Sequence, residues 1–374
     1  MRIPNGPDPA LSAAESSTIA KRILYFDALE SFAIFLVVAV HSVWLNGDIP
    51  ASISMSLSPV AVPLFFMVHG ALLLSRKDSR KKHLRRSLRV VSQLLIWLTI
   101  YLIISLFFGW NKVPLTRRSL YQYYFEAQSI NGTMGLGGSL WFIYALLFIY
   151  LLHPILYALR ETGLLRYLAL LLAIFSFGSQ EIQTWGAYLG KALEISSFSP
   201  EYLFRFFNPL GRYGNCVFYY ILGYLLFDAI QTHSPKISSF KRRFLVISGF
   251  LFVSGLLLLM IERRIEFGTY SYNWKPLSNQ YYRLGGILQA IGLFCLFSQI
   301  HFQEERCGIL KAISTHTIDI YYIHPIIVKL MYDHLFKQAY AGVLQNYIRA
   351  VIALIISFYL GQFIRRIPFL KRIL

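Results

Sequence analysis

Apolar residues recur along this chain in runs long enough to cross a lipid bilayer, with polar segments between them. A transmembrane helix needs about 17–25 predominantly apolar residues. By that measure the sequence predicts helices at 23–45, 59–75, 90–110, 140–159, 164–178, 213–230, 244–261, 284–300, 312–332 and 349–366. The run 164–178 is the shortest of them. The pattern therefore indicates an all-α, polytopic integral membrane protein with about ten transmembrane helices.

The composition agrees with lipid as the surrounding solvent. Of the 374 residues, 56% are hydrophobic and 14% are charged, whereas a soluble domain carries about 25% charged residues. No gap between the apolar runs is longer than a loop, which favours one membrane domain over residues 22–374. Residues 1–21 are polar and rich in Pro, Ser and Ala, and they lack the basic start and short apolar core of a signal peptide. We expect them to form a disordered cytoplasmic tail.

The basic residues indicate how the helices are oriented. The formal net charge is +18, but the Lys and Arg residues lie between the apolar runs and do not form a groove with interleaved aromatics, which argues against a nucleic-acid partner. The segment from Arg76 to Arg89 is the most basic of the chain, and a cytoplasmic N-terminus puts most Lys and Arg residues inside. The bias predicts that both termini are cytoplasmic. Such a loop also binds anionic lipid headgroups.

Three ionisable residues, Asp27, Glu30 and His41, fall in the first predicted helix. Such residues cost about 2.5–3.5 kcal/mol inside a membrane and are therefore candidates for function. Glu30 and His41 are eleven residues apart, which puts them on one helix face about 16 Å from each other. His41 has the chemistry of a general base, and helix packing is its alternative role. Asp27 and Glu30 are candidates for the same catalytic site or interfacial carboxylates paired with basic residues.

Arg86 and Arg89 lie three residues apart where the third predicted helix begins. That spacing places them on one face of a helix, where the two guanidinium groups can hold a phosphate by bidentate hydrogen bonds. A cytoplasmic cofactor that carries a nucleotide fits such a pair. The alternative role is contact with lipid headgroups.

The ninth predicted span is too polar to face lipid on all sides, so we expect it to line the protein interior or a wet cavity. Between Ile313 and Asp333 it carries His316, Asp319, Tyr321, Tyr322, His324 and Lys329. Two further histidines inside apolar runs, His69 and His153, are weaker candidates. The chain has no HExxH, GxSxG, P-loop or GxGxxG motif in a usable context, and its three cysteines show no CxxC spacing. We expect no metal.

Six segments resemble, in chain order, motifs of the acyltransferase-3 family. They are YFDALESFAIFLVVAVHS (25–42), VPLFFMVHGALLL (62–74), RRSLRV (85–90), LWFIYALLFIYLLHPIL (140–156), YYILGYLLF (219–227) and ISTHTIDIYYIHP (313–325). The resemblance extends over nearly the whole chain. It implies a multi-pass enzyme of a bacterial cell membrane that transfers an acyl group to a sugar hydroxyl of a cell-surface or exported glycan. The implied donor is acetyl-CoA on the cytoplasmic side.

The resemblance also assigns roles to individual residues. His41 matches the essential histidine of the family, and Arg86 with Arg89 matches its cytoplasmic arginine pair. Positions that we expect to bind substrate are Trp141, Tyr321, His324 and His69. In the implied mechanism the nucleotide of acyl-CoA binds the arginine pair, its arm passes between helices, and His41 activates an acceptor hydroxyl that arrives from the outer face.

Two positions depart from the family pattern. Glu30 stands where the family usually has an arginine, and His69-Gly70 stands where it usually has Ser-Gly. Either change is compatible with an altered donor or acceptor, a rearranged site or loss of activity. The alternatives to an enzyme are an inactive family member and a transporter or flippase that relays protons through the intramembrane ionisable residues. The transporter predicts internal repeats and paired broken helices, which the sequence does not show.

Overall fold

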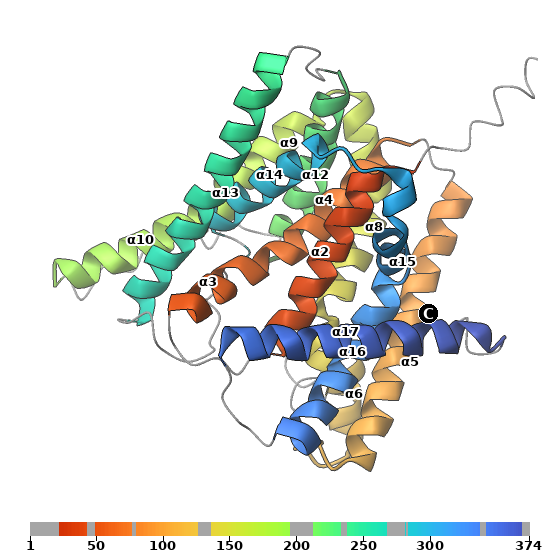
Figure 1. Ribbon diagram of the computed structural model, residues 1–374. Coiled ribbons are helices and arrows are strands. Elements are labelled where there is room, and N and C mark those ends of the chain that lie inside the picture. The colour runs from red at the N-terminus through yellow and green to blue at the C-terminus, as the bar shows by residue number, and fades with distance from the viewer. Residues whose placement is uncertain are drawn as a thin grey trace, which may run out of the picture.

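A computed structural model describes residues 22–42, 49–76, 80–125, 136–194, 212–232, 238–267, 281, 283–336 and 342–368. All regular structure in these ranges is helical (Figure 1). The expected tail, residues 1–21, and the end of the first predicted helix, residues 43–45, lie outside the described residues. The all-α prediction is confirmed.

Each predicted apolar run forms a helix, because a chain in lipid can satisfy its backbone polar groups only within helices or closed barrels. In chain order these helices are α2 (Leu24–His41), α4 (Ala61–Leu74), α5 (Arg80–Phe107), α8 (Trp141–Glu161), α9 (Leu165–Leu172), α12 (Arg212–Thr232), α13 (Ser238–Phe267), α14 (Leu284–Gln299), α16 (Thr317–Met331) and α17 (Val343–Arg366).

Six stretches of the described helices are long and apolar enough to cross a membrane. They are Leu24–His41, Ile49–Leu74, Lys81–Phe107, Gly137–Glu161, Lys241–Ile265 and Val343–Arg366. Two further apolar helices, Leu165–Gly178 and Leu284–Gln299, are shorter. The number of long spans is smaller than the ten predicted, because several of the apolar runs form short or interrupted helices. The chain is nevertheless a multi-pass membrane protein.

Two of the predicted spans differ from single straight helices. The ninth breaks at His316 into α15 (Gly308–Thr315) and α16, and the second is lengthened at its start by α3 (Ile49–Leu57). Short helices also form between the predicted spans, namely α6 (Arg117–Phe125) and α10 (Ser179–Ala192). The break before α16 sets the direction of the helix that carries Tyr321 and His324.

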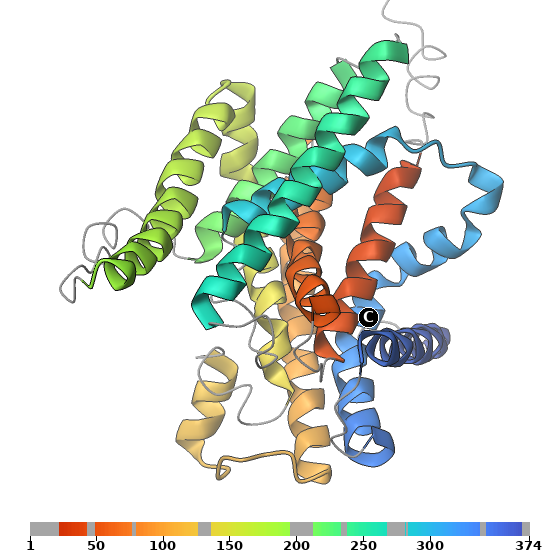
Figure 2. The same ribbon diagram turned by 60° about the vertical axis from the view of Figure 1, so that its left-hand side comes forward.

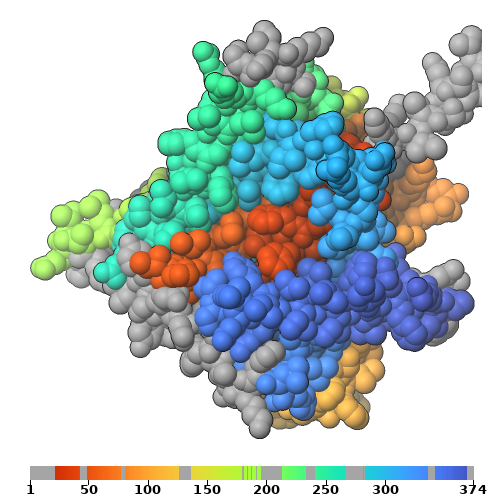
Figure 3. All heavy atoms as spheres, in the orientation of Figure 1, coloured from red at the N-terminus to blue at the C-terminus, as the bar shows by residue number. Residues whose placement is uncertain are grey.

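Helix α2, which carries Asp27, Glu30 and His41, packs against many other helices. It contacts α4, α14, α15, α16 and α17, and most of its residues are buried. In the space-filling view α2 is visible between the segment 284–316 above it and α17 below it (Figure 3). A charged or polar side chain on α2 therefore meets other helices more often than it meets lipid.

Helices α4 and α12 cross with their backbones in contact. A Cβ at Gly70 would lie 1.7 Å from the Tyr220 carbonyl oxygen, and one at Gly223 would lie 2.0 Å from the Met67 carbonyl oxygen. Only glycine fits such an approach, which is typical of helix pairs in membranes. The Gly of the sequence pair His69-Gly70 thus has a packing function, and it brings α12 next to His69.

Helix α17 runs across the other helices and is held there by an ion pair whose carboxylate is buried. It is seen side-on in Figure 1 and nearly end-on in Figure 2, whereas α5 stays upright in both. Arg365 of α17 donates from Nε and Nη2 to the two carboxylate oxygens of Asp319, at 2.6 and 2.7 Å. Gly361 permits this approach, since a Cβ there would lie 2.7 Å from the Asp319 Cβ. The pair fixes α17 against α16.

Candidate active site

His41 is the last residue of α2, and its side chain is exposed. The centroid of its ring lies 5.2 Å from that of His324, which α16 holds in a fully buried position. The centroid of the Tyr321 ring lies 5.9 Å from that of His324. The structure therefore brings together three of the predicted site residues, His41, His324 and Tyr321, from opposite ends of the chain.

The hydrogen bonds of His324 define its tautomer. Its Nδ1 lies 3.0 Å from the Ile320 carbonyl oxygen, and because a carbonyl only accepts, Nδ1 carries the proton. In the neutral ring Nε2 is then an acceptor. Nε2 is buried and has no hydrogen-bond partner among the described residues.

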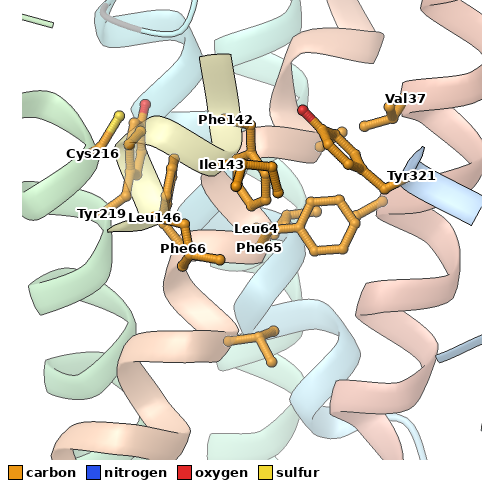
Figure 4. Packing of buried hydrophobic residues seen from close by; sticks show 14 of the residues in the cluster. Val37, Leu64, Phe65, Phe66, Phe142, Ile143, Leu146, Cys216, Tyr219 and Tyr321 are labelled. Carbon is orange, nitrogen blue, oxygen red and sulfur yellow. The ribbon is translucent and has the colours of Figure 1, made fainter. Parts of the chain in front are cut away.

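Trp141 begins α8, and Tyr321 of α16 packs against the start of that helix. The Tyr321 hydroxyl donates to the Ser139 carbonyl oxygen, and its ring packs 5.4 Å from that of Phe142, inside the core shown in Figure 4. Trp141 is half-buried, with its ring 5.5 Å from that of Tyr281. Tyr321 therefore joins α16 to α8 through contacts that use its hydroxyl, while Trp141 keeps part of its surface accessible.

The predicted arginine pair faces two directions. Arg86 is half-buried, and its guanidinium carbon lies 5.9 Å from the Tyr150 ring centroid. It also interacts electrostatically with His69. Arg89 is exposed, because at about 100° per residue it lies farther than Arg86 from the buried stripe of α5, which includes Val90. The structure turns Arg86 toward the interior and Arg89 away from it.

Two further histidines meet near the start of α5, where His83 lies one turn before Arg86. The rings of His83 and His153 stack with centroids 5.1 Å apart, and His153 Nδ1 lies 2.8 Å from the Tyr220 hydroxyl. His83 is 9% exposed, and its Nδ1 has no hydrogen-bond partner in the part of the chain that the structure describes. The sequence marked His153 as a weak candidate and missed His83. Its spacing of four and seven residues from the buried Ser87 and Val90 was the available signal.

The carboxylates of α2 hold the helix against α15. Asp27 accepts two hydrogen bonds from Arg22, both of 2.7 Å, and that arginine also donates to Thr315. Glu30 accepts a bond of 2.6 Å from the Ser314 hydroxyl. These contacts lie about three to four turns of α2 away from His41. A catalytic role for Asp27 or Glu30 stays a prediction, and the contacts themselves are those of helix packing.

There are two polar centres, one at Arg86 and one at the rings of His41 and His324. Tyr150 interacts electrostatically with both Arg86 and Glu30, so the first centre shares a neighbour with Glu30. Glu30 is eleven residues of helix from His41, or about 16 Å at 1.5 Å per residue.

Comparison with known proteins gives one match, and it covers most of the chain. Residues 23–366 match the family Acyl_transf_3, described as an acyltransferase domain. No curated protein and no solved structure matches significantly. The matched range contains both polar centres and every candidate residue discussed above. The chain belongs to the acyltransferase-3 family and is an acyltransferase of the membrane.

Proposed function

We propose that this enzyme moves an acetyl group from cytoplasmic acetyl-CoA onto a hydroxyl of a cell-surface or exported glycan. The observation that supports this most directly is that Arg86 shares the neighbour Tyr150 with Glu30, while His41 lies about 16 Å from Glu30 along α2. A donor with phosphates at one end and a thioester at the end of a long arm has the same two-part layout.

The phosphates of the donor bind at Arg86. A guanidinium holds phosphate oxygens in a bidentate fork, and the neighbouring imidazoles of His69 and His83 supply further hydrogen-bond donors. Arg89 and the exposed lysines of the same segment attract the anionic donor to the entrance from the cytoplasm. The membrane surface on this side is the cytoplasmic one because the segment 76–89 concentrates the basic residues.

The transfer itself takes place at His41. Its imidazole takes the proton of an acceptor hydroxyl while the hydroxyl oxygen attacks the thioester carbonyl carbon. The C–S bond then breaks, and the departing CoA thiolate takes up a proton from His41, so that the enzyme returns to its starting state. General base catalysis of this kind contributes about 10²–10⁴-fold, and positioning of the two substrates supplies the rest.

The acceptor approaches His41 from the side of Trp141. The half-buried indole beside Tyr281 offers an apolar face with a polar edge, and such a surface suits a sugar ring that has both apolar C–H groups and hydroxyls. The acceptor hydroxyl reaches His41 without crossing the membrane, since the exposed ring lies at the end of α2 opposite Arg22.

The test uses the purified protein in lipid vesicles with acetyl-CoA labelled in the acetyl group. We expect His41→Ala to lower transfer of label to an envelope glycan fraction at least 100-fold, with the unfolding temperature unchanged. The matched control is His301→Ala, because His301 is an exposed histidine on the loop that follows α14. Equal transfer by His41→Ala and the wild type would rule out His41 as the general base. Transfer of the label to another class of acceptor would refute the proposal that the acceptor is a glycan.

A further inference from the structure

We propose that His324 orients His41 by accepting a hydrogen bond from its imidazole, so that the catalytic base and a positioning residue form a histidine pair between α2 and α16. This inference rests on the proposed role of His41 as the base. It assigns His324 to the base, whereas the sequence predicted that it binds the substrate.

The distance between the rings permits such a bond. Ring nitrogens lie about 1 Å from the centre of an imidazole, so rings with centroids 5.2 Å apart can bring two nitrogens to about 3 Å, a normal hydrogen-bond length. The rings are tilted by 45°, and they interact electrostatically. Rotation of the exposed His41 side chain about its own bonds completes the contact, because α16 holds His324 fixed.

The tautomer of His324 makes it the acceptor of the pair. Its Nδ1–H is donated to the Ile320 carbonyl oxygen, so its buried Nε2 offers a lone pair that no described residue uses. Tyr321 also lies against the ring, but its hydroxyl is donated to Ser139. Among these neighbours the N–H of His41 is the donor that remains. A hydrogen bond from it stabilises the structure, because a buried acceptor without a donor is unfavourable.

The bond has two consequences for the reaction. It fixes which nitrogen of His41 carries the proton in the resting enzyme and thus which one faces the acceptor hydroxyl, as in other sites where a third group orients the base. It also strengthens when His41 takes up a proton, because a hydrogen bond from a charged donor is about twice as strong as a neutral one. His324 therefore acts on the protonated state of His41 and stays neutral itself.

The test compares His324→Leu, which has no acceptor, with His324→Gln, whose side-chain oxygen can accept the bond. For His324→Leu we expect kcat to fall about 10- to 100-fold while KM for acetyl-CoA changes less than twofold, and for His324→Gln we expect part of the rate to return. If His324→Leu does not fold, His324→Phe keeps a planar ring without an acceptor and takes its place. Equal rates for the Gln variant and the apolar variant would overturn the proposal.

A double-mutant cycle separates this inference from the proposed function. In a His41→Ala background, the apolar substitution at His324 should cause no further loss, because the group that it positions is absent. If His41→Ala lowers the transfer rate and the substitution at His324 does not, only the proposed histidine pair is refuted. If His41→Ala itself has no effect, the base assignment fails first. Losses that multiply in the double variant would show that the two residues act independently.

Discussion

Replacing Arg86 with lysine is expected to weaken binding of the acyl donor. Lysine keeps the positive charge of the side chain but loses the planar fork that makes two parallel hydrogen bonds to a phosphate. Arg86 is half-buried against the Tyr150 ring, so its contacts are less screened by water than those of an exposed charge. The exposed Arg89 on the same helix provides a comparison with identical chemistry.

The magnitude follows from the number of bonds lost. A hydrogen bond to a charged group is worth about 1.5–3 kcal/mol, so loss of one from the fork at Arg86 raises Kd about 10- to 150-fold. If the residues of this segment bind only lipid headgroups, each charge contributes about 1 kcal/mol, and an exchange of arginine for lysine changes little. Arg89→Lys is therefore expected to raise Kd less than about fivefold.

The assay is equilibrium binding of acetyl-CoA to the purified protein in discs of neutral lipid, where the attraction of anionic headgroups is removed. Four variants are compared with the wild type: Arg86→Lys, Arg89→Lys, Lys81→Gln and Lys82→Gln. The variants at Lys81 and Lys82 are controls for net charge, because both side chains are exposed in the first turn of α5. Each protein is first checked for an unchanged unfolding temperature.

Two results would refute the reasoning about Arg86. One is an Arg86→Lys variant that binds the donor as tightly as the wild type, which would mean that the fork is not used. The other is an equal loss for Arg86→Lys and Lys81→Gln, which would return the arginine to the group of residues that act only by charge.

Three further predictions concern the fold and its orientation. Gly70→Ala should lower the free energy of unfolding by about 1–3 kcal/mol or more, because the added Cβ meets the α12 backbone. The control Gly249→Ala should leave thermal unfolding unchanged, because no atom lies within 4 Å of a Cβ at that position. Asp319→Asn should cost up to about 3 kcal/mol, the low end for a buried pair because its arginine partner is 35% exposed, and a denaturation midpoint equal to the wild type would contradict this. A cysteine at Lys81 should react with an impermeant reagent only after permeabilisation, whereas one at Arg118 should react in intact cells; the reverse pattern would invert the topology.

The sequence by itself determined the class of the fold and the positions of the candidate residues along the helices. Apolar runs of bilayer length left helices as the structure that satisfies the backbone in lipid, and each run did form one. Ionisable residues inside those runs stood out because of their cost in a membrane. The same reasoning placed Glu30 and His41 about three turns apart on α2, which holds wherever that helix packs.

Only the tertiary structure decided which of these side chains meet. His41 and His324 are nearly three hundred residues apart in the chain, and Arg86 and Arg89 differ in direction although they lie three residues apart. In a soluble helix the apolar stripe shows which face is buried. A membrane helix is apolar toward lipid as well as toward its neighbours, so the pattern does not reveal which face of α5 or α16 turns inward. That choice depends on close contacts between helices, such as the contact of Gly70 in α4 with the backbone of α12. The sequence around Gly70 does not show which helix it will contact.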